Sequence, residues 1–276
     1  MSVSTRELTA WLPAVLEIAA QAGREIMRIY ETGFNVTFKR DRSPLTEADL
    51  AAQRVIAAGL AALTPQVPML GEESPPELFE RRRAWSTLWL VDPLDGTREF
   101  VKRNGEFAVS IALVEDHLPV LGVLHGPALQ RSYGAARGCG SFRYDPRGER
   151  TALHVLEHAP TPLRVLGSRS HGDAVLDRML ERLGPQQRVA LGSALKFGLL
   201  AEGGADLYVR RGPTSEWDTA AGQAVVLEAG GQVVDFAGQP LRYNAHEQIT
   251  NPSFLAYADS SRDWVGLLGD ANGATA

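Results

Sequence analysis

The chain has very little cysteine and no long apolar segment. Its 276 residues include a single cysteine, which excludes an intramolecular disulfide framework and is typical of a reducing compartment. No stretch is continuously apolar for the roughly 18 residues that a membrane span requires, and the N-terminus lacks the apolar core of a cleavable signal. We therefore expect a cytoplasmic protein without an integral membrane segment.

An excess of positive charge is also absent. The sequence contains 28 Lys and Arg against 33 Asp and Glu, a net charge of −5. This balance argues against a general nucleic-acid surface and against a strongly basic membrane face. Arg81, Arg82 and Arg83 form a brief basic run, which we interpret as a solvated helix face. The chain is long enough for one core to divide into two lobes.

The spacing of apolar residues predicts a mixed α/β chain. Helical spacing covers residues 8–30, with a stop at Gly33, and residues 47–63. After residue 160 the pattern changes to alternating strands and helices, so we expect an N-terminal lobe over 1–160 and a C-terminal lobe over 161–276. A mainly antiparallel sheet is expected from strands near 68–71, 88–91, 107–114, 120–125 and 131–135. The second lobe is expected to contain strands near 164–166, 188–191, 207–209 and 232–235, with helices over 173–183, 194–201 and 218–229.

Two acidic residues follow an apolar run at a tight turn. Asp92 and Asp95 are separated by Pro93 and Leu94, directly after residues 89–91, which are typical of a buried strand. Both carboxylates and the Leu94 carbonyl can then face one small volume. Such an oxygen-only site suits Mg²⁺ or Mn²⁺ better than zinc. The alternative is an ordinary Asp-Pro and Asp-Gly turn.

Acids from two other segments also stand at the ends of predicted elements. Glu72 and Glu73 follow a short apolar strand, and Asp218 lies at the start of an Ala-rich helical segment. Acids gathered from distant segments are typical of two-metal phosphoryl transfer. An acid in a first helical turn is also favoured by the helix dipole without any metal. Thr46 and Asp49 likewise match a capping box.

The acidic segments resemble, in order and spacing, the three signatures of the inositol monophosphatase superfamily of Mg²⁺-dependent, lithium-sensitive phosphatases. The three strings are Gly71-Glu72-Glu73, Asp92-Pro93-Leu94-Asp95-Gly96-Thr97 and Trp217-Asp218-Thr219-Ala220-Ala221-Gly222. The resemblance covers nearly the whole chain. Strings at 43–49, 89–107, 168–171, 192–197 and 212–214 are more similar to the bacterial 3′(2′),5′-bisphosphate nucleotidases of the CysQ type. Arg98 departs from that subfamily, which usually has Lys, but the positive charge is kept.

The resemblance implies a layered αβαβα sandwich of two lobes, with the metal site between them. It implies that two or three Mg²⁺ ions are held by Glu72, Asp92, Asp95, Asp218 and the Leu94 carbonyl. Asp49 and Thr97 are the implied pair that orients the attacking water. The implied substrate contacts are Gly96, Thr97, His171, Ser193, Lys196, Arg210 and Asp218. From local sequence alone, a lone loop histidine such as His171 is more often simply exposed, and Lys196 fits a surface lysine on a helix equally well.

The activity that the resemblance implies is hydrolysis of the 3′-phosphate of adenosine 3′,5′-bisphosphate to AMP and phosphate, in sulfur assimilation. 3′-Phosphoadenylyl sulfate is a further implied substrate, so the expected partner is a small phosphorylated nucleotide and not a nucleic acid. An inositol monophosphatase is the alternative with the same chemistry, but it would not need the second anion site that Ser193, Lys196 and Arg210 suggest. A nucleotide-binding regulator without turnover is the alternative from another class. The resemblance also implies a peripheral position on the inner membrane face, as in some members of the family. The sequence leaves the oligomeric state open.

Overall fold

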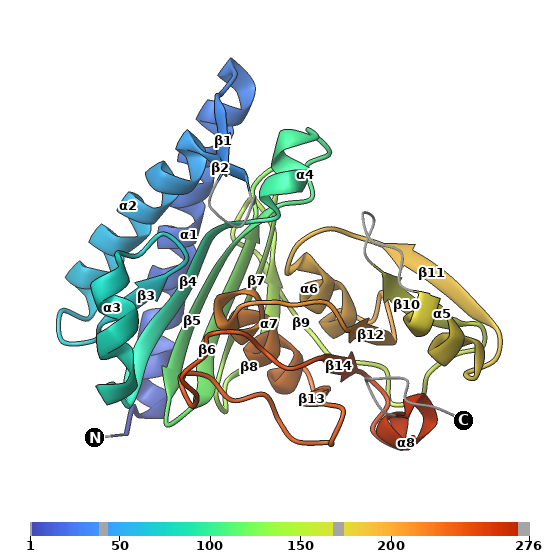
Figure 1. Ribbon diagram of the computed structural model, residues 1–276. Coiled ribbons are helices and arrows are strands. Elements are labelled where there is room, and N and C mark those ends of the chain that lie inside the picture. Colours follow the sequence, from blue (N-terminus) through green and yellow to red (C-terminus); the bar gives the residue numbers. More distant parts are fainter. Residues whose placement is uncertain (1, 39–43, 168–173, 270–276) are drawn as a thin grey trace.

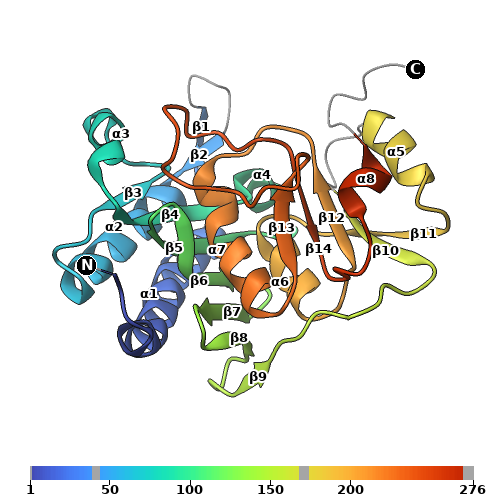
Figure 2. The same cartoon turned by 90° about the horizontal axis from the view of Figure 1, so that it is seen from below.

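Two β-sheets alternate with three layers of helices in the computed structural model, which describes residues 2–38, 44–167 and 174–269 (Figure 1). The expected αβαβα arrangement is confirmed. The first sheet is covered on one face by two long helices and on the other by a central helix pair, which also contacts the second sheet. A final helix layer covers the outer face of the second sheet (Figure 2).

The first sheet has seven strands in sequence order. They are β3 (Met69–Gly71), β4 (Thr87–Asp95), β5 (Ala108–Glu115), β6 (Leu118–Gly126), β7 (Arg131–Ala136), β8 (Gly140–Tyr144) and β9 (Arg150–Ala152). The pairing of β3 with β4 is parallel, and the other pairings are antiparallel, as the short predicted turns suggested. Every residue of β5 is buried, because helices cover both faces of the sheet at its centre.

The two long N-terminal helices form as the apolar spacing predicted. α1 (Thr5–Thr32) begins with a capping box between Ser4 and Glu7 and ends at Gly33, whose φ of 105° suits only glycine. α2 (Glu47–Leu63) has the predicted bounds. Their apolar faces form one core with Trp89 and its neighbours on the first sheet. A short hairpin of β1 (Val36–Phe38) and β2 (Pro44–Thr46) connects them.

The second sheet has five strands in the order β11-β10-β12-β14-β13. They are β10 (Leu163–Gly167), β11 (Gln186–Ala190), β12 (Leu207–Arg210), β13 (Gln232–Asp235) and β14 (Phe254–Tyr257). The sequence did not predict β14, a four-residue strand after a long irregular segment. β14 pairs antiparallel with both β12 and β13, so it joins the edge strand β13 to the rest of the sheet.

The remaining helices lie between and outside the sheets. α6 (Leu195–Ala201) and α7 (Glu216–Glu228) form the central pair, while α5 (Ala174–Glu181) and α8 (Trp264–Leu268) cover the outer face of the second sheet (Figures 1 and 2). Three short helices lie in the connections of the first sheet. α3 (Pro76–Arg81) and η1 (Arg82–Ala84) lie between β3 and β4, and α4 (Thr97–Val101) follows β4. α7 packs on β5 and β6 although it follows residue 160. The lobe boundary at that residue therefore stays a prediction.

The interpretation of the basic run as a solvated face is wrong for Arg82. Its side chain is buried, whereas Arg81 and Arg83 are exposed. The guanidinium donates to Asn244 Oδ1 at 2.8 Å, to the His246 carbonyl at 2.9 Å and to the Glu247 carbonyl at 2.6 Å. These oxygens belong to an irregular loop that does not pair with a strand. The buried guanidinium of Arg82 supplies the hydrogen bonds that they would otherwise lack.

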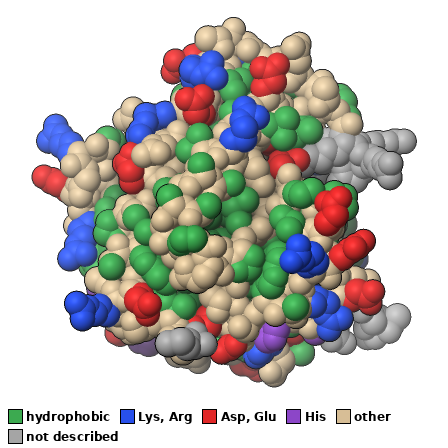
Figure 3. All heavy atoms as spheres, turned by 90° about the vertical axis from the view of Figure 1, so that its left-hand side faces the viewer, with side chains coloured by type: hydrophobic (Ala, Val, Ile, Leu, Met, Phe, Trp, Pro, Cys, Tyr) green, Lys and Arg blue, Asp and Glu red, His purple; other side chains and the backbone are tan. Residues whose placement is uncertain are grey.

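The distribution of charged side chains on the surface agrees with the sequence, which has no excess of positive charge. On the face shown in Figure 3, acidic and basic side chains are interspersed around apolar ones. None of the helices within the described ranges is long and apolar enough to cross a membrane.

Candidate active site

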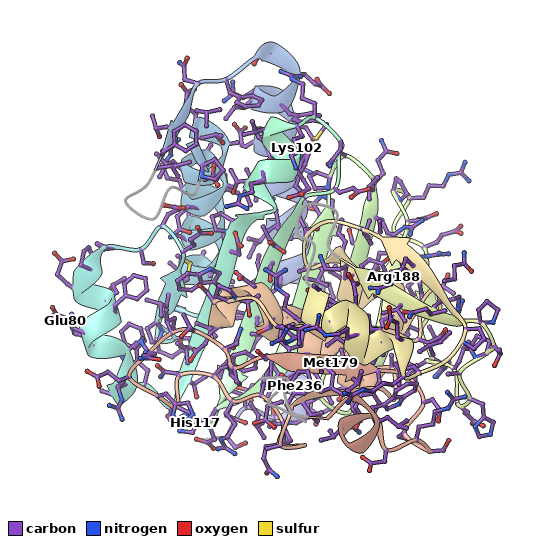
Figure 4. The ribbon with its side chains drawn as sticks, turned by 45° about the vertical axis from the view of Figure 1, so that its right-hand side comes forward. Glu80, Lys102, His117, Met179, Arg188 and Phe236 are labelled. Atoms are coloured by element: carbon purple, nitrogen blue, oxygen red, sulfur yellow. The ribbon has the colours of Figure 1, made fainter. Side chains whose placement is uncertain are left out.

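Acids from three distant segments line one cavity of about 890 Å³. Glu72 follows β3, Asp92 and Asp95 end β4, and Asp218 lies in the first turn of α7. Leu94 and Thr97 line the same cavity. The predicted gathering of these acids is thus what the structure shows. The first residues of α4 and of α5 also line this cavity, and Figure 4 labels Lys102, which follows α4, and Met179 of α5.

The end of β4 directs its two acids into this cavity. The pairing with β5 shifts register between Asp92 and Asp95, where Pro93 cannot donate to the ladder. Asp92 is buried and its Oδ1 accepts from the Leu94 N–H at 2.9 Å. Gly96 then turns the chain with a φ of 90°, and α4 begins at Thr97. The predicted turn is therefore an irregular last stretch of the strand itself.

The clustered carboxylates repel one another. Burial raises the pKa of Asp92 well above its usual value, and the charges of Glu72, Asp95 and Asp218 raise it further. Burial and then Asp95 raise the pKa of Asp218 in the same way. Burial also raises the pKa of Asp95, to about 6, although Lys196 opposes this. A cation is the natural way to compensate such a cluster.

The donor set fits a hard divalent cation, since it consists of carboxylates and a backbone carbonyl. No group of three or more His, Cys, Asp and Glu side chains among the described residues is arranged to hold an ion as it stands. Three of the acids instead accept backbone hydrogen bonds: Asp92 from the Leu94 N–H, Asp95 from the Ala194 N–H and Asp218 from the Ser215 N–H, the last at 2.8 Å. The residue types fit magnesium, and their assignment as ligands remains a proposal.

Asp49 has one oxygen in a helix cap and the other beside Thr97. Its Oδ2 accepts from the N–H and the hydroxyl of Thr46, both at 2.7 Å, so the predicted capping box is confirmed. The Thr97 hydroxyl lies 3.4 Å from Asp49 Oδ1 and 3.2 Å from the Leu94 carbonyl. Burial, and after it the charge of Glu72, raise the pKa of Asp49, although the Thr46 hydrogen bonds oppose this. The capping role therefore leaves one carboxylate oxygen for the predicted role with water.

A second, smaller cavity of about 140 Å³ adjoins the acids and contains the predicted anion contacts. It is lined by Asp95, Gly96, Ser193, Lys196, Arg210 and Asp218, among others. The alternative that Lys196 is a surface lysine is wrong, because it is buried. Its ammonium donates to the Leu191 and Ser193 carbonyls at 3.2 and 2.8 Å and lies 5.3 Å from the centre of the Tyr208 ring. Burial lowers the pKa of Lys196 to about 8, and Asp95 opposes that shift.

Arg210 lies at the end of β12 and lines both cavities. Its Nε is buried and has no hydrogen-bond partner within the described part of the chain, a state that an anionic ligand would relieve. Sequence reasoning missed Tyr208, which also lines both cavities. Alternation along β12 could have indicated that Tyr208 and Arg210 share a face. His171 lies outside the described residues.

The metal-free protein is expected to lose stability as the pH rises from about 5 to about 8. The folded-state pKa of Asp95 is raised from 3.8 to about 6, and those of Asp92 and Asp218 are raised as well. Such acids bind protons more tightly when folded, so their contribution to stability is present at low pH and is lost as the pH passes their folded-state values. Thermal unfolding in EDTA and in Mg²⁺ at matched ionic strength would measure this. We expect the Tm gained with Mg²⁺ to grow with pH by several degrees, and a gain independent of pH would contradict the prediction.

Comparisons with known proteins agree with this geometry. The model of the inositol monophosphatase family matches residues 7–262. The 3′(2′),5′-bisphosphate nucleotidase CysQ of Escherichia coli K12 is 49% identical over 88% of this chain and 98% of its own length. The CysQ of Aggregatibacter actinomycetemcomitans is 39% identical over 93% and 96% of the two chains. The crystal structure of CysQ from Bacteroides thetaiotaomicron has a TM-score of 0.79 and 37% identity, with 90% of this chain and 97% of that one covered. From its matched family model, its relatives and its layered fold, the chain belongs to the inositol monophosphatase family.

Proposed function

We propose that the chain is a phosphatase that hydrolyses the 3′-phosphate of adenosine 3′,5′-bisphosphate to AMP and phosphate, with Mg²⁺ as cofactor. Its curated relatives are named 3′(2′),5′-bisphosphate nucleotidases. The observation that carries the proposal is the placement of the clustered acids beside a second cavity that contains Lys196 and Arg210. One part suits a metal-bound reacting phosphate, and the other suits a second phosphate on the same substrate.

Glu72, Asp92, Asp95, Asp218 and the Leu94 carbonyl would hold the magnesium. When bound, Mg²⁺ supplies charge neutralisation on the phosphate oxygens and a lower pKa for a bound water. Among the chain's own groups, the Thr97 hydroxyl orients the attacking water and Asp49 Oδ1 accepts a proton through it. The backbone N–H groups of Gly96 and Thr97, where α4 begins, would contact the reacting phosphate.

The second phosphate would be held by Ser193, Lys196 and Arg210. Two of the three N–H groups of the Lys196 ammonium donate to carbonyls of its own turn, and the third remains for a phosphate oxygen. The larger cavity continues from Asp218 past Arg210 to Pro213 and to the first residues of α5. Its volume of about 890 Å³ leaves room for a nucleoside. 3′-Phosphoadenylyl sulfate carries anionic groups at the same two ends and is proposed as a further substrate, which places the enzyme in sulfur assimilation.

A phosphate-release assay with Mg²⁺ tests the proposal against its alternatives. We expect kcat/KM for adenosine 3′,5′-bisphosphate to exceed the values for 3′-AMP and for inositol 1-phosphate. Equal or better turnover of inositol 1-phosphate would overturn the choice of substrate in favour of an inositol monophosphatase. Nucleotide binding without turnover of any substrate would instead support a regulator. Asp92→Asn prepared in the same way controls for a contaminating phosphatase.

A further inference from the structure

The turn that presents the anion contacts is held by two carboxylates. Glu106 Oε2 accepts a hydrogen bond from the Gly192 N–H at 2.8 Å, and Asp95 accepts one from the Ala194 N–H. Ser193 stands between these two anchored amides with a φ of 53°, a conformation uncommon for a residue other than glycine. The turn over residues 191–194 is therefore fixed by its surroundings and not by local preference.

The segment containing Glu106 is packed between the metal acids and this turn. A Cβ added at Gly192 would lie 2.6 Å from the Glu106 carbonyl oxygen, so the two backbones approach too closely for any side chain at this position. On the other side, a Cβ at Gly96 would lie 3.2 Å from the same oxygen. The Asn104 side chain accepts from the Glu106 N–H at 3.0 Å and fixes the approach of the segment.

The position of the Lys196 ammonium depends on the same turn. It donates to the carbonyls of Leu191 and Ser193, and the Leu191 carbonyl belongs to the same peptide group as the Gly192 N–H that Glu106 holds. A shift of the turn would therefore move the hydroxyl of Ser193 and the ammonium of Lys196 together. Glu106 is 9% exposed and lines neither cavity, so it acts through the turn and not through substrate.

We propose that Glu106 is a positioning residue for the second phosphate: it holds the 191–194 turn so that Ser193 and Lys196 stand at a fixed distance from the metal acids. The inference rests on the proposed function, because it assigns the origin of selectivity for a substrate with two phosphates. A carboxylate would repel a phosphate placed against it, which agrees with its position behind the turn.

A pair of substrates separates this role from a merely structural one. Adenosine 3′,5′-bisphosphate and 3′-AMP carry the same reacting phosphate, and only the first carries a second phosphate. For Glu106→Ala we expect KM for the bisphosphate to rise on the order of tenfold, the size typical of a lost charge-assisted hydrogen bond. We expect kcat for the bisphosphate and both parameters for 3′-AMP to stay within about threefold, a range small against that loss. Glu106→Gln keeps an acceptor oxygen and should show a smaller rise in KM.

Glu115→Ala is the matched control. Glu115 is also buried, lies at the far end of β5 and accepts from the Val3 N–H, so its loss should lower Tm without changing the substrate ratio. If Glu106→Ala does not fold, the test uses Glu106→Gln. We would then compare its KM for the bisphosphate with its KM for 3′-AMP and measure its Kd for AMP by calorimetry on metal-free protein. Equal losses on both substrates, or no loss on either, would overturn the inference. A wild-type enzyme that shows no preference for the bisphosphate would overturn the proposed function instead.

Discussion

The Asp92→Asn variant is expected to lose kcat by about 10³-fold, the effect of removing one strong electrostatic contact from a transition state. Its metal-free form is expected to be more stable than the wild type. Burial and the charges of Glu72, Asp95 and Asp218 raise the pKa of Asp92, so the ionised carboxylate destabilises the fold at neutral pH. Asparagine removes that charge, and its side-chain oxygen can still accept from the Leu94 N–H.

The two opposite effects are measured separately. Phosphate release in Mg²⁺ gives kcat, and thermal unfolding in EDTA gives Tm. Asp259→Asn is a matched control at another buried aspartate: burial raises the pKa of Asp259, but hydrogen bonds from Ser261 and Ala159 outweigh this, and the net shift is downward. That variant should lose stability and keep its kcat. Near wild-type kcat in Asp92→Asn would contradict the assignment of Asp92 as a metal ligand, and a lower Tm in EDTA would contradict the destabilising charge at this position.

Local signals were sufficient for the elements that have strong periodicity or clear ends. α2 has its predicted bounds, because the apolar spacing and the pattern of Thr46 and Asp49 agree on where it starts. Residues 88–91 were predicted as a strand, but β4 extends to Asp95. Pro93 suggested a turn, and only the register of β5 shows that pairing resumes after it. The four residues of β14 gave no signal of comparable length.

Some features of the site could likewise be predicted from local sequence, whereas others depend on contacts between residues far apart in the chain. The acids lie in compact motifs, so their gathering in one cavity could be predicted from the sequence together with a family resemblance. The burial of Lys196 could not, since it results from the packing of α6 against β12, where Tyr208 lies beneath the ammonium. Glu106 was part of a recognised string without a role, because its partner Gly192 is 86 residues away.

A second large loss of kcat is expected at Thr97, where substitutions can remove the hydroxyl and leave the packing of the side chain nearly unchanged. Its hydroxyl lies between Asp49 Oδ1 and the Leu94 carbonyl, so it can orient a water toward the acid cavity. Thr97→Val keeps the shape and removes the hydroxyl, and we expect kcat to fall about 10²-fold, as when assistance to proton transfer is lost. KM should change little, because the second phosphate is held elsewhere. Thr97→Ser restores the hydroxyl and should recover most of the kcat, so equal losses in both variants would assign Thr97 to packing at the start of α4 and remove it from the proposed mechanism.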